Sequence, residues 1–308
     1  MDDIEISSIS QYIDIIEELQ KTYLASSILN NPAITTLIFR GVCDGDYPLL
    51  PSVFRQDIVP FENTQIANDK YTSWASEEVL LKSFIAEAVR YIKDIPPQNL
   101  CKWAEHAQHY GVPTRFLDWT SNPLAALYFA CKCDDDKNAV VWVLHSINYQ
   151  RFSAVHNKKM QSSDSKENLA IEGTISCDEI INRLLAGKPA IDYPIIYTPY
   201  YADTRMSTQS CYFMVWGNKK EPLEKLIPQE NYMVYQQKYE NEDHSTGIDQ
   251  DGKILLKLVI HNDRKQSLIR QLDMLGVNEK SLFPGLDGIG RYIERKYRFD
   301  YDELLDHI

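Results

Sequence analysis

Apolar residues repeat every three or four positions in three stretches of the N-terminal half, a spacing that predicts helices with one buried face. These stretches are Ser10 to Ala25, Ser76 to Ile92 and Gln98 to Tyr110. Gly111 and Pro113 follow the third stretch, and both residue types commonly end a helix. Two more helices are predicted near the C-terminus, at Arg264 to Leu275 and Leu286 to Tyr297.

Short apolar runs bounded by turn residues predict buried strands. They are Thr36 to Arg40, Ala139 to Leu144, Pro194 to Thr198, Cys211 to Trp216 and Ile254 to Ile260, and Thr114 to Thr120 also reads as extended. The polar segments Gln161 to Asn168 and Glu240 to Gly252 are predicted as surface loops. Because strands and helices interleave irregularly, we predict a single α+β domain with a mixed sheet and flanking helices.

Composition narrows the class of protein and of partner. The 308 residues are 44% hydrophobic and 25% charged, values typical of a globular domain, and the net charge is −12. This acidity, without a dense Lys/Arg run, argues against nucleic acid as the main partner. The six cysteines lack the paired spacing of a zinc site, so we expect no metal and reduced thiols in a cytoplasmic protein. No run approaches the roughly 20 apolar residues that span a bilayer, so no membrane association is expected.

The most informative segment runs from Trp103 to Ala130, where polar residues are enclosed between two apolar helical patterns. Ionisable groups are rarely buried unless they are paired, so such a cluster either bonds to itself or meets a ligand. His109 lies in the last turn of its predicted helix and is either a capping residue or a ligand-binding or proton-transferring one. Arg115 and Asp118 should point to opposite faces of an extended segment and find separate partners.

Further candidates come from the ends of predicted elements. Thr120, Ser121 and Asn122 open an apolar helix, where backbone N–H groups form either an ordinary cap or an anion site. Arg40 ends a strand before Gly41 and either pairs with Asp44 or Asp46, or binds a phosphate or carboxylate while Gly41 gives a ligand access to the backbone. Arg205 and Gln209 precede a strand and are weaker candidates. Glycine-rich phosphate loops and the motifs of serine or zinc hydrolases are absent.

These residues resemble the FRG domain family, named for its Phe-Arg-Gly signature. The matching phrases are Phe39-Arg40-Gly41, Leu49-Leu50-Pro51-Ser52 with Arg55, Gln108-His109-Tyr110-Gly111, Pro113-Thr114-Arg115, Leu117-Asp118-Trp119-Thr120, Asn122-Pro123-Leu124 and Ala126-Leu127-Tyr128-Phe129-Ala130. Arg205, Gln209 and Phe213 resemble a later family phrase, in which Cys211 stands where glycine is usual. The resemblance implies an N-terminal helical extension over residues 1–30 and the FRG domain with C-terminal helices over residues 31–308.

The order of these residues is also similar to the ADP-ribosyltransferase layout. That similarity implies an NAD-directed enzyme, a transferase or an NAD-consuming hydrolase, of the kind found among bacterial toxins and anti-phage effectors. Arg40 would then clamp NAD, Thr120 or Ser121 would shape the nicotinamide pocket, and Gln209 would bond to the ribose. Neutral Gln209 stands where an acid is expected, so His109 or Asp118 would supply the acid–base chemistry.

Two other hypotheses stay open. One is a non-catalytic module that binds a nucleotide or small anion and signals to a protein partner through its flanking helices. The other is a nuclease or hydrolase that uses His109 and Asp118, which the acidic charge and the missing metal cluster disfavour.

Overall fold

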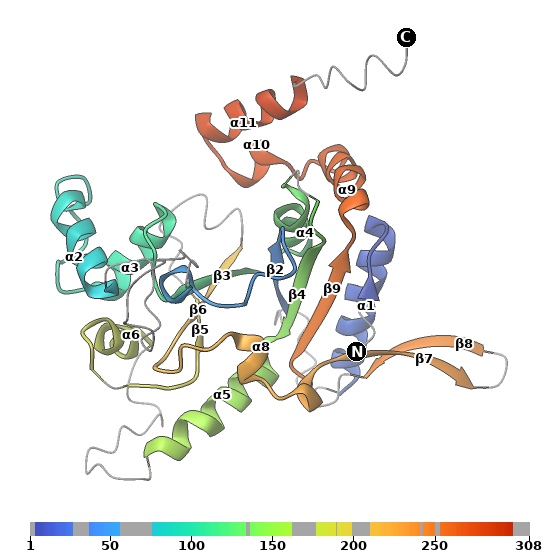
Figure 1. The fold of residues 1–308 in the computed structure, drawn as a ribbon, viewed down its shortest axis with the longest axis horizontal. Helices are drawn as coiled ribbons and strands as arrows, with labels where there is room; N and C mark the ends of the chain where they lie inside the picture. The colour runs from blue at the N-terminus through green and yellow to red at the C-terminus, as the bar shows by residue number, and fades with distance from the viewer. Residues whose placement is uncertain are drawn as a thin grey trace, which may run out of the picture.

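A seven-stranded sheet forms the centre of the molecule, in the order β1-β9-β4-β2-β3-β6-β5 (Figure 1). This computed structural model describes residues 4–26, 37–55, 76–133, 136–161, 177–188, 190–198, 210–240, 243–249 and 253–297. Strand β1 runs parallel to β9, and the other neighbours in the sheet pair antiparallel. The predicted α+β fold with a mixed sheet is therefore confirmed.

The described strands are β1 (Ile4–Glu5), β2 (Leu37–Val42), β3 (Phe116–Thr120), β4 (Ala139–His145), β5 (Ile195–Tyr197), β6 (Cys211–Val215), β7 (Val234–Glu240), β8 (Asp243–Asp249) and β9 (Leu255–Ile260). The described α-helices are α1 (Ile9–Ser26), α2 (Glu77–Ala88), α3 (Leu100–His109), α4 (Pro123–Cys131), α5 (Ser146–Gln161), α6 (Cys177–Leu185), α8 (Leu223–Leu226), α9 (Asn262–Met274), α10 (Glu279–Leu282) and α11 (Leu286–Tyr297). Two short 3₁₀ helices are η1 (Ser52–Phe54) and η2 (Gln229–Asn231).

Successive residues of each strand point to opposite faces of the sheet, and different hydrophobic clusters cover the two faces. On one face, Phe39 packs in a cluster with α1, α4 and α9, whereas Phe116 and Phe213 pack in a separate cluster with α2, α3 and α6. On the opposite face, Ile38 and Trp119 share a cluster with η1, α5 and α8. The first face therefore has two cores, and they meet near the boundary between β2 and β3.

The pairing of β2 with β3 is much shorter than the other pairings of these two strands. All six residues of β2 pair with β4, and all five residues of β3 pair with β6. Between β2 and β3 the register holds one pair within these fully described strands, Phe39 with Thr120. The sheet thus opens beyond this pair, because Arg40 and Gly41 stay paired with Trp142 and Val141 of β4 but do not pair with β3.

Most predicted elements are confirmed within a few residues, but the polar segment Glu240 to Gly252 is a correction. Predicted as a loop, it forms much of the β7–β8 hairpin, with Tyr239 paired to His244 and Glu240 to Asp243. Helices α5 and α6 were not predicted. The segment Gln161 to Asn168 lies outside the described residues except for Gln161, which ends α5.

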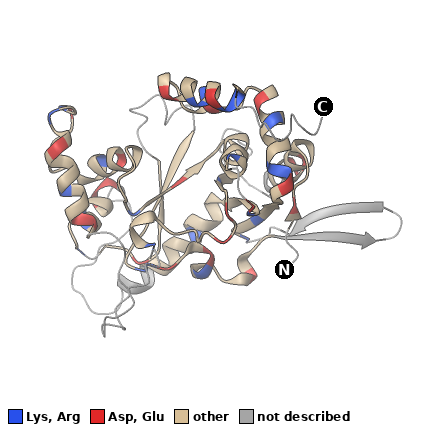
Figure 2. Ribbon diagram, turned by 45° about the horizontal axis from the view of Figure 1, so that its top comes forward, with Lys and Arg blue, Asp and Glu red and all other residues tan. Residues whose placement is uncertain are grey.

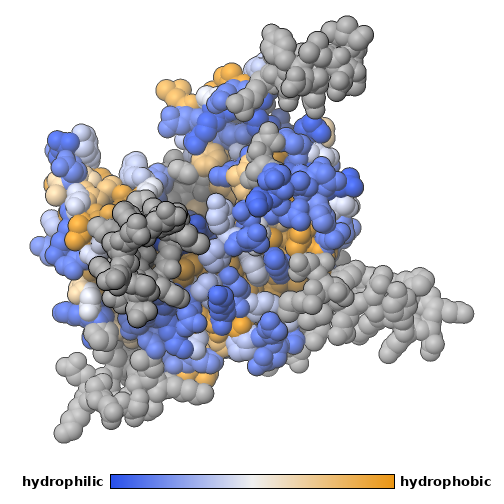
Figure 3. Space-filling model, viewed as in Figure 1, coloured by the Kyte–Doolittle hydropathy of each residue, from blue (hydrophilic) through white to orange (hydrophobic). Residues whose placement is uncertain are grey.

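The N-terminal segment contributes to the sheet and to its core. Ile4 pairs with Leu258 of β9, and Tyr12 and Leu19 of α1 are fully buried. Charged residues lie mainly on the helices, whereas the strands of the sheet are largely uncharged (Figure 2). The face seen in Figure 3 is mostly hydrophilic, with smaller hydrophobic areas between. Among the described residues, no helix combines the length and apolar character needed to cross a bilayer.

Candidate functional site

A cavity of about 410 Å³ lies where β2 and β3 separate. Its walls come from β2, β3, β6, the loop after β2 and the C-terminal ends of α3 and α4. The volume falls within the range of roughly 300–1,000 Å³ usual for small-molecule sites. Among the predicted site residues, the cavity brings together Arg40, Gly41, His109, Asp118 and Thr120.

Arg40 bridges the two separating strands. Its Nη1 donates to the backbone carbonyl of Asp118 at 2.6 Å, across 78 residues of sequence. This bond accounts for the position of Arg40 without Asp44 or Asp46, the two local partners that the sequence offered. The guanidinium is therefore held at the mouth of the opening by a main-chain oxygen that carries no net charge.

The cavity lining carries more positive than negative charge. Arg40, Arg55 and Lys132 line it together with the carboxylate of Asp118. Burial lowers the pKa of Arg40 to about 10; Asp118 opposes this shift and the charge of Arg55 adds to it. Arg40 still carries its proton at neutral pH, so the site is suited to an anionic ligand.

Gly41 has a structural role that the sequence did not reveal. A Cβ atom at this position would lie 1.8 Å from the carbonyl oxygen of Ala126 and 2.6 Å from the amide nitrogen of Ala130. Glycine is therefore required because α4 crosses directly over β2. Gly41 also lines the cavity. The expected access of a ligand to the backbone at this position stays a prediction.

The C-terminal end of α3 delivers two polar side chains to the cavity. Gln108 and His109 both line it, and Gln108 Nε2 donates to Asp118 Oδ2 at 2.9 Å. The His109 ring meets the Tyr110 ring edge-on at 5.0 Å between centroids. His109 thus lies at the helix end, as predicted, and also faces the space that a ligand would occupy.

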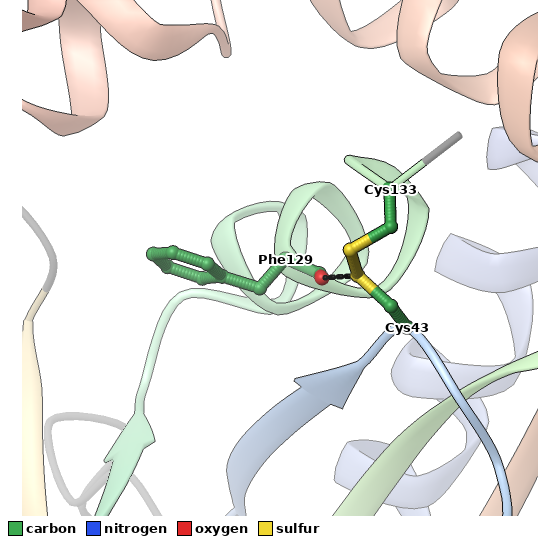
Figure 4. Close-up of a disulfide and its surroundings, with 3 residues drawn as sticks. All are labelled: Cys43, Phe129 and Cys133. Carbon is green, nitrogen blue, oxygen red and sulfur yellow. Dashed lines mark hydrogen bonds between the residues drawn. A yellow bond between two sulfur atoms is a disulfide. The ribbon is translucent and has the colours of Figure 1, made fainter. Parts of the chain in front are cut away.

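A disulfide between Cys43 and Cys133 forms part of the cavity wall (Figure 4). It joins the residue after β2 to a residue just beyond α4, with 5.8 Å between the Cα atoms. The Cys43 sulfur also lies 3.4 Å from the carbonyl oxygen of Phe129. The expectation of reduced thiols is therefore wrong for these two cysteines, whereas Cys101, Cys131 and Cys211 are buried thiols that belong to no disulfide.

Arg115 lies outside the cavity lining, although it had been predicted to bind the ligand. Its Nη2 and Nε donate to Glu77 Oε2 at 2.6 and 2.8 Å, and its Nη1 donates to the carbonyl of Trp216 at 3.1 Å. Both side chains of this pair are only 11% exposed. Arg115 and Asp118 have separate partners, as expected, but Arg115 ties α2 to the start of β3 and does not face the cavity.

Asn122 closes the N-terminus of α4 as an ordinary helix cap. Its Oδ1 accepts from the amides of Leu124 at 3.0 Å and Ala125 at 3.2 Å, and its own amide donates to Thr120 Oγ1 at 2.9 Å. Ser121 donates its amide to the carbonyl of Ser210 at 3.1 Å. Of the predicted anion site at this helix end, only Thr120 lines the cavity among the described residues.

Arg205 and Gln209 lie outside the described residues. Several residues that were not predicted as site residues also line the cavity, namely Tyr47, Arg55, Gln108, Phe129 and Lys132. Arg55, Gln108 and Phe129 were within the family phrases, so a signal was present for all three. Nothing in the sequence distinguishes Lys132 from other surface lysines.

Comparison with known proteins identifies the family of the central segment. Residues 35–139, about a third of the chain, match the model of the FRG domain. No curated protein and no solved structure matches the chain. The chain thus contains an FRG domain, and the similarity to ADP-ribosyltransferases gains no support from these comparisons.

Proposed function

We propose that the cavity binds a phosphate-bearing nucleotide, that NAD is the first candidate, and that His109 and Asp118 act on it. The observation that carries the proposal is the presence of two arginines in the lining of one cavity. The charge of Arg55 lowers the pKa of Arg40, and Lys132 adds a third cation to the lining. A phosphate or pyrophosphate group relieves this repulsion and accepts hydrogen bonds from both arginines.

The apolar part of the lining suits the remainder of such a ligand. The rings of Tyr47, Phe129 and Phe213 line the cavity, and flat aromatic rings are suited to packing against a base or nicotinamide. Cleavage of NAD breaks the bond between C1′ of the ribose and the nicotinamide nitrogen, while water or another acceptor forms a new bond to C1′. Asp118 or His109 is placed to take the proton of that acceptor, and nicotinamide leaves as a neutral molecule.

Binding and turnover are tested together on the purified full-length chain. We expect calorimetry to show saturable NAD binding that weakens with added salt, and chromatography to show nicotinamide release. Arg40→Ala should weaken binding about 10- to 100-fold, the range for hydrogen bonds to charged groups. Arg90→Ala is the matched control because Arg90 is exposed on the surface beside α2. Binding of neither NAD nor pyrophosphate by the wild-type chain would refute the proposal.

The alternative is a non-catalytic nucleotide-binding module that signals to a protein partner. Helix α11 supports it, because Leu286, Ile289, Ile293 and Tyr297 form an exposed apolar stripe while Arg295 bonds inward to Glu279 at 2.6 Å. Saturable thermal stabilisation by NAD without any nicotinamide release would favour this module over the enzyme.

A role as a bacterial toxin or anti-phage effector follows from the enzymatic form of the proposal, because NAD turnover inside a cell would deplete its NAD. Expression of the wild-type chain in bacteria should then arrest growth and lower cellular NAD. Arg40→Ala, produced at the same level, should do neither. Growth arrest with unchanged NAD would separate toxicity from NAD consumption.

A further inference from the structure

A relay of hydrogen bonds leads from the protein interior to the carboxylate of Asp118. The backbone amide of Phe116 donates to Thr114 Oγ1 at 3.1 Å. The Thr114 hydroxyl donates to Gln108 Oε1 at 2.6 Å, and Gln108 Nε2 donates to Asp118 Oδ2 at 2.9 Å. The relay thus connects the start of β3, the end of α3 and the cavity.

The direction of every bond in this relay is fixed. A hydroxyl group has one proton and two acceptor sites. Because Thr114 Oγ1 accepts from the Phe116 amide, which can only donate, its proton is available for Gln108 Oε1. Because the Asp118 carboxylate can only accept, the amide of Gln108 turns its NH₂ group to Asp118 and its oxygen to Thr114. The Thr114 hydroxyl, which donates to that oxygen, therefore holds Gln108 in the orientation that meets the carboxylate.

Exposure changes along the relay from its inner to its outer end. Thr114 is 3% exposed, Gln108 is partly buried and Asp118 is exposed at the cavity. The inner end is therefore enclosed in the packed interior, and the outer end reaches the space for a ligand. A carboxylate accepts up to about four hydrogen bonds, and the Gln108 amide uses one of them. Asp118 keeps the capacity to accept a donor from a bound molecule.

The position of Asp118 beside the cationic part of the lining indicates what kind of hydrogen-bond donor the ligand offers to this carboxylate. Arg40 contacts the backbone of the same residue at 2.6 Å, so an anion held by Arg40 lies next to the Asp118 carboxylate. A ligand that bonds to both the Arg40 guanidinium and the Asp118 carboxylate needs a hydroxyl group close to a phosphate. The ribose of a nucleotide has this arrangement, and a deoxygenated sugar lacks it.

We propose that Gln108 and Thr114 are positioning residues that orient Asp118 to accept a hydrogen bond from a ribose hydroxyl of the bound nucleotide. This inference rests on the proposed function and adds the sugar to the ligand chemistry. It also gives a purpose to the Gln108 side chain, which otherwise links two elements already joined by the six-residue loop between His109 and Phe116.

The experiment measures sugar discrimination, with ADP-ribose as the probe. Two analogues lack the 2′- and 3′-hydroxyls, one on the adenosine ribose and the other on the distal ribose. Pyrophosphate reports the anion site alone. For the wild-type chain, we expect ADP-ribose to bind about tenfold or more tightly than one of the analogues, as for a hydrogen bond to a charged acceptor. Pyrophosphate should bind in an Arg40-dependent manner.

Matched variants separate positioning from simple packing. Gln108→Met keeps the approximate size and the neutrality of the side chain but removes the NH₂ donor, and Thr114→Val keeps the shape but removes the hydroxyl group. Both should bring the discrimination ratio close to one and leave the pyrophosphate affinity within about twofold. Thr114→Ser retains a hydroxyl group and should keep the wild-type ratio.

The possible failures are distinguishable. If no probe binds to the wild-type chain, the proposed function fails and this inference fails with it. If ADP-ribose and pyrophosphate bind but neither analogue is discriminated, or if Gln108→Met keeps the ratio, nucleotide binding stands and the relay is refuted. Equal loss of affinity for ADP-ribose and pyrophosphate in the variants would show a purely structural role, and would also refute it.

Discussion

Two arginine–carboxylate clusters lie along β3, and they differ in what completes them. At the start of the strand, the Arg115 guanidinium makes two bonds to Glu77, and both side chains are largely buried. In the middle, Arg40 bonds to the main chain of Asp118, while the Asp118 carboxylate bonds to neutral Gln108. The first cluster is closed by opposite charge, and the second leaves charges of both signs at a cavity. The same residue types therefore serve stability in one place and binding in the other.

Removal of the Arg115 guanidinium is the strongest test of this difference. Arg115→Ala leaves the buried carboxylate of Glu77 without its charged partner, although the backbone amide of residue 115 still donates to Oε1, and we expect the free energy of unfolding to fall by about 3–5 kcal/mol. Arg40→Ala should change it by less than about 1 kcal/mol while weakening nucleotide binding. Urea denaturation at pH 7.5 measures both. Equal destabilisation by the two substitutions would contradict the division into a closed and an open cluster.

The pH dependence of stability tests another buried polar residue, His145 at the end of β4. Burial lowers the pKa of His145 from 6.5 to about 4, and Arg151 adds to this effect, while a backbone hydrogen bond opposes it. The unfolded chain takes up the proton first, so stability due to this residue is present above pH 6.5 and is lost as the pH falls towards 4. We expect His145 to account for about 2 kcal/mol of destabilisation at pH 5 relative to pH 8.

The control for this prediction is His145→Asn, which retains an acceptor for the backbone amide of Asn148. Urea denaturation between pH 5 and pH 8 should show a smaller pH dependence for this variant than for the wild-type chain. An unchanged dependence would assign the acid sensitivity to other groups.

The smallest expected effect concerns Asn122, which the sequence placed among the ligand-binding residues. As a helix cap, it should cost about 1 kcal/mol of unfolding free energy when replaced by alanine, and much less when replaced by aspartate. Neither substitution should change the affinity for pyrophosphate. A loss of pyrophosphate binding in Asn122→Ala with unchanged thermal stability would show that this residue binds the ligand together with Arg40.

The similarity to the ADP-ribosyltransferase layout implied that Arg40 and Asp118 serve one site, and both residues line one cavity. The sequence could not predict the partner of Arg115, since Glu77 lies 38 residues earlier, on a helix whose packing depends on the complete fold. The β7–β8 hairpin was missed because its strands are rich in polar residues, without the alternation that marks a half-buried strand. The need for glycine at position 41 arises from the crossing of α4, which no local pattern encodes.

The bond between Cys43 and Cys133 has a consequence for the integrity of the whole segment between them. It closes a covalent ring over 90 positions, and that ring contains α2, α3, β3, α4 and most of the residues that match the FRG domain. A single peptide cleavage anywhere inside the ring leaves two fragments that stay attached. They would migrate together in an electrophoresis gel without reductant and part once it is added, so a nicked molecule can keep both walls of its pocket.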